Sequence, residues 1–209
     1  MLTRALTASA HRPVAATYDP MVPADDRAQA LANALPPTLQ NVLAAGTMRR
    51  QSRFAEDDRF LGVTGVWQPP AGLTAEHVQM ARRALTDLED TVLAPSDPVP
   101  LLGRVLALLS HFPARGMSPE VEQAMAADWA EDLADYPLWA VEQAARQWRR
   151  TRKWRPTIAE MRDLCAEITA VEREFAKRLA TIVKTGVRAE AGPTATVLAL
   201  AARSVRRIA

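Results

Sequence analysis

The sequence predicts an all-α fold: a small bundle of about four helices, with extra N-terminal helices and a long, partly projecting closing helix. Apolar residues recur every three or four positions over most of the second half of the chain, which is the spacing of one helix face. Strand patterns are nearly absent. Only Phe60 to Trp67 reads as a strand, and Gly62 and Gly65 weaken it.

The N-terminal part of the chain begins with a segment rich in Ala and Thr. Residues 1–24 are expected to be disordered, with a composition that fits a bacterial tail or an organelle transit peptide. Residues 25–95 are expected to form a helical region. It holds two short helices interrupted by Pro36-Pro37, then a polar loop, then a helix capped by Thr74. The loop contains Arg49, Arg50 and Arg53.

Prolines and caps divide the rest of the chain. The run from Ala94 to Pro98 breaks the preceding helix and is the expected domain boundary, so that residues 99–185 form the bundle. Ser118 precedes Pro119, a proline at the first helical position, where its missing N–H costs nothing. Thr157 and Glu160 form a capping box that opens the closing helix over residues 158–185. The expected core includes Trp129, Leu138, Trp148 and Ile158.

Charge is distributed unevenly along the chain. Residues 146–209 contain 15 Lys and Arg against six Asp and Glu, whereas residues 1–145 contain 11 against 18. The change is abrupt, because residues 118–145 hold seven acids and no base. Such asymmetry indicates a polyanion or an oppositely charged partner, although two solvated helix faces of opposite sign are the plainer interpretation.

A basic–aromatic segment follows the acidic stretch and is the candidate site for nucleic acid or a partner. Cations release counterions from phosphates, and flat rings stack on unpaired bases. Trp148 falls on the apolar stripe and is expected in the core, whereas Trp154 lies in a loop and fits a plug or a stacking platform equally. The candidate residues are Arg146, Arg149, Arg150, Arg152, Lys153, Trp154 and Arg155.

The tail beyond the bundle, residues 186–209, is expected to be a flexible basic segment. Gly186 is expected to end the closing helix, and Gly192-Pro193 marks a joint. The candidate partner-binding residues of this tail are Arg203, Arg206 and Arg207.

The sequence gives no pattern for catalysis, a cofactor or a metal, so we expect a protein that is not an enzyme. Its one cysteine, Cys165, lies at an apolar helical position and is expected to be a buried thiol. The three histidines lack ligand spacing, and the glycines form no phosphate-binding loop. No apolar run approaches the roughly 18 residues that span a bilayer. We expect no membrane partner and a location in the cytoplasm of a bacterial host.

Residues 101–168 carry several motifs in a fixed order. They are His111-Phe112-Pro113, Asp128-Trp129 followed by Leu133, Asp135-Tyr136-Pro137, and the string from Lys153 to Arg162, KWRPTIAEMR. With these motifs the segment resembles the small phage family of helicase loaders and helicase inhibitors. The resemblance implies a helical protein that delivers a replicative helicase or holds it inactive. In the family the region beyond the bundle engages the helicase, and residues 187–209 would be its counterpart.

Three functional hypotheses follow. The first is a non-enzymatic DNA-replication adaptor, encoded by a phage or prophage, that binds a replicative helicase and contacts single-stranded DNA. The second is a transcriptional regulator with a helix-turn-helix-like arrangement, although the bases of the third helix cluster at its C-terminal end. The third is a coiled-coil assembly protein or homodimer through residues 158–185, in which Glu172 falls where an apolar residue is expected.

Overall fold

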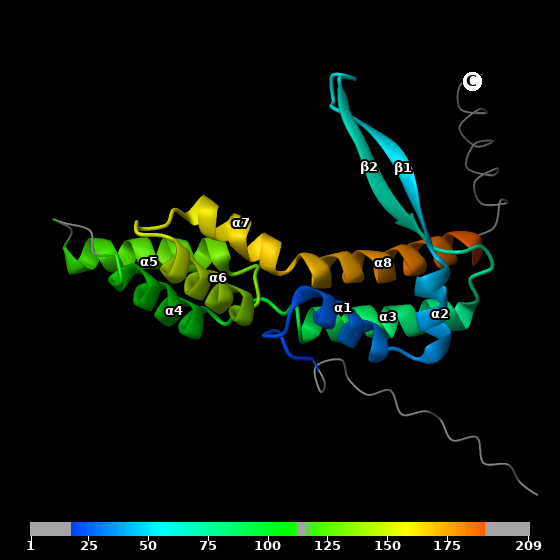
Figure 1. Cartoon of the computed structure of the whole chain (residues 1–209), viewed down its shortest axis with the longest axis horizontal. Coiled ribbons are helices and arrows are strands. Elements are labelled where there is room, and N and C mark those ends of the chain that lie inside the picture. The colour runs from blue at the N-terminus through cyan, green and yellow to red at the C-terminus, as the bar shows by residue number, and fades with distance from the viewer. Residues whose placement is uncertain (1–17, 113–115, 117, 191–209) are drawn as a thin grey trace, which may run out of the picture. The chain divides into compact units, whose positions relative to one another are not determined.

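A computed structural model describes residues 18–112, 116 and 118–190 (Figure 1). The elements in order are α1 (Ala24–Asn33), α2 (Pro37–Ala45), β1 (Thr47–Phe54), β2 (Phe60–Gln68), α3 (Ala75–Asp90), α4 (Pro98–Ser110), α5 (Pro119–Leu133), α6 (Leu138–Thr151), α7 (Ile158–Ile168) and α8 (Ala170–Glu190).

The chain divides into two compact units. Among the described residues, the first unit contains residues 35–85 and 177–190, and the second contains residues 18–34 and 86–176. The division falls within α3 and within α8.

The second unit is built on four helices, α4 to α7, which enclose an apolar core. As the apolar spacing predicts, Trp129 and Trp148 are buried, and Leu138 and Ile158 are half-buried against the same core. Not every apolar residue of α4 and α5 faces this core. Leu106 and Val121 are exposed, whereas Leu108 and Ala126 are buried. A helix has 3.6 residues per turn, so a stripe read at strict four-residue spacing drifts around the helix.

The predicted helix starts are confirmed. The Ser118 side chain accepts a hydrogen bond from the Val121 N–H at 3.5 Å, with Pro119 in the first turn. Thr157 and Glu160 form the capping box, in which the Thr157 N–H donates to Glu160 Oε2 at 2.8 Å and the Glu160 N–H donates to Thr157 Oγ1 at 3.2 Å. Each side chain thus satisfies a backbone donor that the first helical turn leaves free.

The closing helix is not continuous. Residues 158–185 were expected to form one long helix, but α7 ends at Ile168 and α8 begins at Ala170. At the break, Thr169 Oγ1 donates to the Cys165 carbonyl at 2.8 Å, and Thr169 has φ −90° and ψ 5°. A threonine hydroxyl that bonds back to a carbonyl four residues earlier competes with the helical ladder and bends it.

A buried ion pair links three segments of the second unit. Arg27, on α1, donates through Nε to Glu172 Oε1 at 2.8 Å, and the Glu172 side chain has no exposed surface. Arg27 also donates through Nη2 to the Ile168 carbonyl at 2.8 Å, and its guanidinium lies 5.8 Å from the centroid of the Trp139 ring. The Tyr18 hydroxyl donates to the same Glu172 oxygen. Residues 18–27 are thereby joined to α6, to the end of α7 and to the start of α8.

The first unit shows that the fold is not all-α. β1 and β2 form an antiparallel hairpin in which Thr47 faces Gln68 and Phe54 faces Phe60. The predicted strand is therefore present, but the segment with Arg49, Arg50 and Arg53, expected to be a loop, is its partner strand. Every residue of β1 is exposed, so no buried face marks this strand in the sequence. Figure 1 shows the hairpin standing away from the helices at its base.

The base of the hairpin is held by Trp67. Its ring is buried against Gly46, and a Cβ placed on Gly46 would lie 2.1 Å from Trp67 Cζ2. Only glycine permits this approach, because a Cβ atom does not tolerate a contact under 3.0 Å. Helices α2, α3 and α8 contribute further buried residues to the unit, among them Leu39, Ala81 and Ile182.

The sequence predicted that Gly186 would end the closing helix, and this prediction is wrong. It lies inside α8, which continues to Glu190. A Cβ on Gly186 would lie 2.0 Å from Val78 Cγ2, so this glycine allows α8 to pack closely on α3 within the first unit. Helices tolerate an internal glycine at a cost of about 1 kcal/mol relative to alanine, and close packing offsets it here. Residues 191–209 lie outside the described part of the chain.

Removing one partner of the buried Arg27–Glu172 pair is expected to destabilise the second unit strongly. Changing Arg27 to Ala leaves a carboxylate buried without its cation, which costs about 3–5 kcal/mol of unfolding free energy. Chemical denaturation followed by circular dichroism measures the change. The control is Gln29→Ala on the exposed face of α1. If both variants unfold at the same denaturant concentration as the parent chain, the pair contributes nothing to stability.

Candidate nucleic-acid interface

The C-terminal end of α6 positions the basic–aromatic segment. The inner face of this helix is fixed by Ala140, Val141, Ala144 and Trp148, all buried. Arg149 and Arg150 lie in its last turn, where cations interact favourably with the helix dipole. The Arg152 N–H then donates to the Trp148 carbonyl at 2.8 Å and closes the helix.

Trp154 lies on the surface, beside the core tryptophan. Its side chain is 53% exposed, whereas Trp148 is buried. The two rings meet edge to face, with centroids 6.4 Å apart and an interplanar angle of 87°. Trp148 Nε1 donates to the Trp154 carbonyl at 2.9 Å, which fixes the backbone of the loop under the exposed ring. Trp154 is therefore held in place while half of it stays accessible.

Arg152 joins the two rings. Its guanidinium lies 5.6 Å from the Trp148 centroid and 5.4 Å from the Trp154 centroid, within the range of cation–π attraction. Its side chain is exposed. The charge next to the exposed indole is thus oriented by packing. An ordered cation beside an accessible ring suits a ligand that carries both negative charge and a flat apolar surface.

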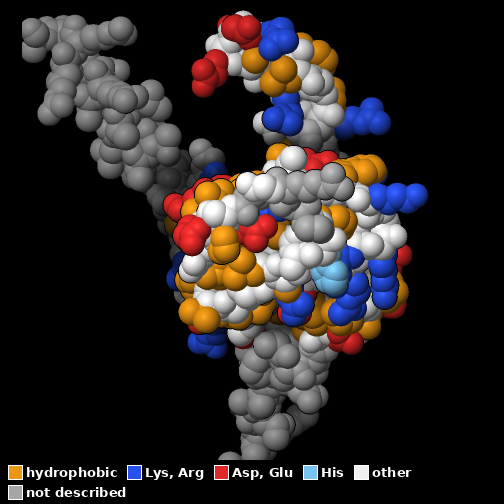
Figure 2. Space-filling view, turned by 90° about the vertical axis from the view of Figure 1, so that its left-hand side faces the viewer, with side chains coloured by type: hydrophobic (Ala, Val, Ile, Leu, Met, Phe, Trp, Pro, Cys, Tyr) orange, Lys and Arg blue, Asp and Glu red, His pale blue; other side chains and the backbone are white. Residues whose placement is uncertain are grey.

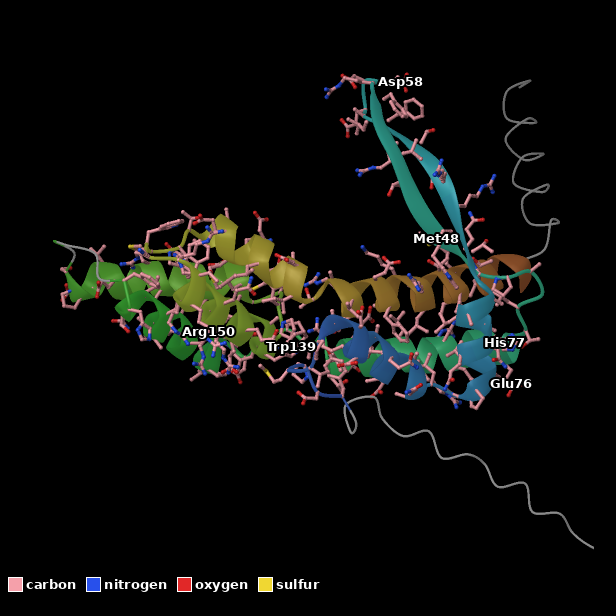
Figure 3. The ribbon with its side chains drawn as sticks, in the orientation of Figure 1. Met48, Asp58, Glu76, His77, Trp139 and Arg150 are labelled. Atoms are coloured by element: carbon pink, nitrogen blue, oxygen red, sulfur yellow. The ribbon has the colours of Figure 1, made fainter. Side chains whose placement is uncertain are left out.

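Arg146 and Arg150 line a hollow of about 420 Å³ on the same unit. Its other lining residues are Met21, Val22, Pro23, Arg27, Gln143, Gln147 and Thr151. Arg146 and Arg150 are exposed, and Figure 3 shows Arg150 on α6. Figure 2 shows several Lys and Arg side chains gathered on one side of the end of the molecule that faces the viewer. This hollow offers two cations and several amide and hydroxyl groups to an anion.

A second hollow, of about 240 Å³, lies beside Arg152 and is acidic. Glu160, Asp163 and Glu167 line it together with Thr151. Hydrogen bonds from the Thr157 backbone and side chain lower the pKa of Glu160, and the nearby Arg152 acts in the same direction. The negative charge on this side disfavours a phosphate chain, whereas the hollow with Arg146 and Arg150 carries positive charge.

The structure places the seven candidate residues of the segment in different environments. Arg146, Arg150, Arg152, Lys153 and Trp154 are exposed, whereas Arg149 and Arg155 are half-buried. Arg155 donates through Nη1 to the Phe112 carbonyl at 3.5 Å, and its Nη2 is buried with no hydrogen-bond partner among the described residues. Arg155 therefore serves the packing of the loop. The tail residues Arg203, Arg206 and Arg207 lie outside the described residues.

Two features of this surface escaped the sequence reasoning. Met21, Val22 and Pro23 line the basic hollow although they precede it by more than a hundred residues, and no local pattern connects them to α6. The Gln143 amide donates to the Pro20 carbonyl and holds that segment in place. The acidic lining beside Arg152 comes from α7, and the helical positions of Glu160, Asp163 and Glu167 place these three acids on one side of that helix.

The alternative interpretations of this region meet specific obstacles. A recognition helix contacts bases from its N-terminal residues, but the start of α6 is occupied by packing, since Trp139 Nε1 donates to the Val92 carbonyl at 2.8 Å and Ala140 is buried. A coiled coil or homodimer through residues 158–185 would need apolar side chains that are free to contact a second chain. Those of Met161, Leu179 and Ile182 are instead buried within this chain.

The described residues show no arrangement typical of a metal centre or a membrane span. No group of three or more His, Cys, Asp or Glu side chains is placed to hold a metal ion in this part of the chain. No helix within it is long and apolar enough to cross a membrane. Comparisons with protein-family models, with curated proteins and with solved structures found no match to this chain.

Cys165 is buried in the core of the second unit, as its apolar position predicts. Burial raises the pKa of the Cys165 thiol to about 12 from its ordinary value of 9.0. The thiol is therefore protonated and inert at neutral pH.

We expect Cys165 to react with iodoacetamide only after the chain is unfolded by urea.

The stability of the folded chain should also depend on pH through this thiol. Since the folded pKa of Cys165 lies above the unfolded value, the contribution of the neutral thiol to the unfolding free energy is complete below pH 9 and is lost as the pH rises towards 12. A Cys165→Ala variant, followed by denaturation across that range, should lose less stability with rising pH than the parent chain. Rapid alkylation of the folded chain would contradict the burial.

Proposed function

We propose that this chain is a non-enzymatic DNA-replication adaptor that binds a replicative helicase, as its loader or its inhibitor, and contacts single-stranded DNA. The observation that carries the DNA part is the exposed Trp154 ring, fixed by Trp148 and flanked by Arg152. Proteins that bind single strands without sequence preference combine such stacking rings with a basic track for the backbone.

The track in this proposal runs along the C-terminal end of α6. Arg146 and Arg150 bind the phosphates in the basic hollow, and Lys153 and Arg152 hold the strand near the exposed ring. The acidic hollow beside Arg152 repels the DNA backbone, so the single strand lies on the side of Arg146 and Arg150. The helicase part is supported by the resemblance of residues 101–168 to the phage loader and inhibitor family.

The stacking role of Trp154 is tested by its substitution with Ala. Stacking on an aromatic side chain contributes about 1–3 kcal/mol per base, so affinity for a labelled oligothymidylate should fall by about five- to 150-fold. Fluorescence anisotropy measures the affinity. Trp154→Phe, which keeps a ring, should retain most of it, and Val121→Ala, another exposed apolar position, should change nothing. Lost stability at unchanged affinity would make Trp154 a structural plug.

The electrostatic role of α6 is tested by the salt dependence of the same binding. On a single strand, each phosphate contact adds about 0.7 to the slope of log affinity against log salt concentration. The double change Arg146→Ala, Arg150→Ala should flatten that slope by about 1.4. Arg82→Ala, Arg83→Ala on the exposed face of α3 removes the same charge as a control.

Co-elution tests the helicase part separately. The full chain should co-elute with the replicative helicase of its host, and the Arg146 and Arg150 variant should still do so. If the chain binds oligothymidylate but no helicase, it is a single-strand-binding protein and the adaptor proposal is wrong. A chain that binds helicase but no DNA at low salt would assign the basic hollow to a protein partner.

A further inference from the structure

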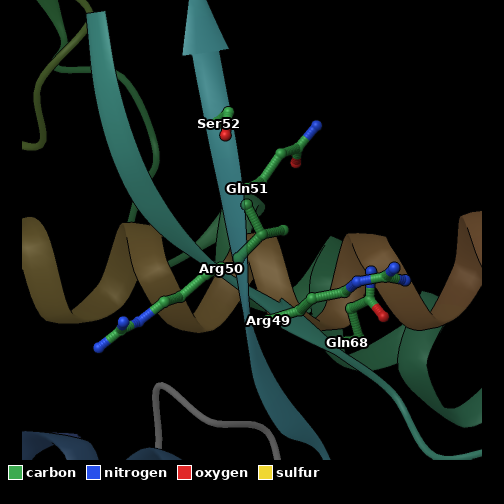
Figure 4. Close-up of a pocket in the computed structure, with 6 residues that line it drawn as sticks. Arg49, Arg50, Gln51, Ser52 and Gln68 are labelled. Carbon is green, nitrogen blue, oxygen red and sulfur yellow. The ribbon is translucent and has the colours of Figure 1, made fainter.

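The hairpin of the first unit has two faces of different character. Residues that alternate along β1 and their partners on β2 lie on the same side of the ribbon. One face carries Arg49, Gln51 and Arg53, opposite Val66, Thr64 and Gly62. Figure 4 shows Arg49, Gln51 and Gln68 on one side of the ribbon and Arg50 on the other.

The other face also carries Arg50 and Ser52 but is otherwise apolar, and its exposed apolar side chains have no cover within the described residues. Met48 is 59% exposed, Val63 57%, Phe54 58% and Phe60 56%. Phe54 and Phe60 face each other across the strands, with ring centroids 5.7 Å apart at an interplanar angle of 63°. Two-stranded hairpins are marginally stable alone in water. Packing of this face against another surface would stabilise the hairpin.

Charges of opposite sign lie on either side of this aromatic pair. Towards the base, β1 carries Arg49, Arg50 and Arg53 and no acid, and at the tip the turn carries Glu56, Asp57 and Asp58. Figure 3 shows Asp58 at the tip and Met48 near the base. Among the described residues, the hairpin holds one ion pair, between Arg59 and Asp57 at 3.8 Å, so the three arginines of β1 lack an acidic partner there.

We propose that the hairpin is a dimerisation element whose apolar face packs on the same face of a second copy. A two-fold axis through the Phe54–Phe60 pair would bring the two aromatic pairs together. Arg50 lies on this same face, four residues from Phe54 towards the base, and Asp58 lies two residues from Phe60 towards the tip. Antiparallel ribbons then place each acidic tip near the partner's Arg50. A surface of this kind is self-complementary, which is the requirement of a two-fold interface.

A second copy fits this surface better than DNA does. The arginines alone would suit phosphates, but the acidic tip repels them, and a strand in a DNA groove would leave the apolar face in water. The overlap of two ribbons is small beside the roughly 1,600 Å² of a standard interface. The dimer is therefore reversible and depends on concentration.

Sedimentation equilibrium of the full chain tests the proposal over a wide concentration series at low salt. The parent chain should pass from monomer to dimer. Phe60→Ser should weaken dimerisation by about a hundredfold, because the two-fold dimer loses the ring twice. Val99→Ser, at another exposed apolar position, is the control. A parent chain that remains monomeric throughout, or a Phe60→Ser chain that dimerises like the parent, overturns the proposal.

Two charge-reversal variants test the antiparallel arrangement without touching the aromatic pair. Arg49→Glu with Arg50→Glu makes the base acidic, and Asp57→Arg with Asp58→Arg makes the tip basic. Each variant alone should be monomeric, because base and tip then repel. Their mixture should restore the dimer, because both contacts become attractive again. A mixture that stays monomeric overturns the arrangement, as does dimerisation of the acidic-base variant alone at the parent affinity.

Duplex DNA is the alternative ligand for this face of the hairpin. The same variants distinguish duplex DNA from a second copy of the chain. In the dimer, Phe60→Ser changes assembly while the affinity of one chain for oligothymidylate is unchanged, and Trp154→Ala does the reverse. If instead the parent chain is monomeric and binds duplex DNA, and the Arg49→Glu, Arg50→Glu variant no longer binds it, the ribbon is a nucleic-acid surface and the proposal is wrong.

Discussion

A carboxylate that is fully removed from water needs a cation and hydrogen bonds, because an unpaired buried charge costs several kcal/mol. In the second unit that constraint falls on Glu172, which has no exposed surface and receives hydrogen bonds from Arg27 and Tyr18. Arg27 also caps the Ile168 carbonyl, an acceptor left free at the end of α7. This one pair therefore joins the N-terminal segment to the end of α7 and to the start of α8.

The same pair bears on the candidate interface. Arg27, Val22 and Pro23 line the basic hollow with Arg146 and Arg150, so the segment that satisfies Glu172 also forms one wall of the site. A buried ion pair adds little net stability compared with apolar packing, but it tolerates only one geometry. We infer that it fixes the shape of the hollow by fixing where residues 21–27 lie.

Local signals predicted the second unit well and the first unit poorly. Caps, turn prolines and apolar spacing act within a few residues, and so Ser118, the Thr157–Glu160 box and the core position of Trp148 could be read directly. β1 could not, because its residues are all exposed and its stability comes from pairing with β2. Glu172 stands out in the sequence as an acid at an apolar position. Its partner Arg27 lies 145 residues away, beyond the reach of any local pattern.

The contact between Trp67 and Gly46 has a consequence for how the chain fluctuates. It is a buried contact at the base of the hairpin, while β1 is exposed along its whole length and β2 beyond Trp67 is exposed or half-buried. The ribbon can therefore open without disturbing the helices, as a separate unit of low opening free energy. Backbone amides of β1 and β2 would exchange with solvent through this local opening, whereas amides of α4 to α7 would wait for global unfolding. Such a hierarchy lets one part of a chain sample many conformations at little cost to the rest.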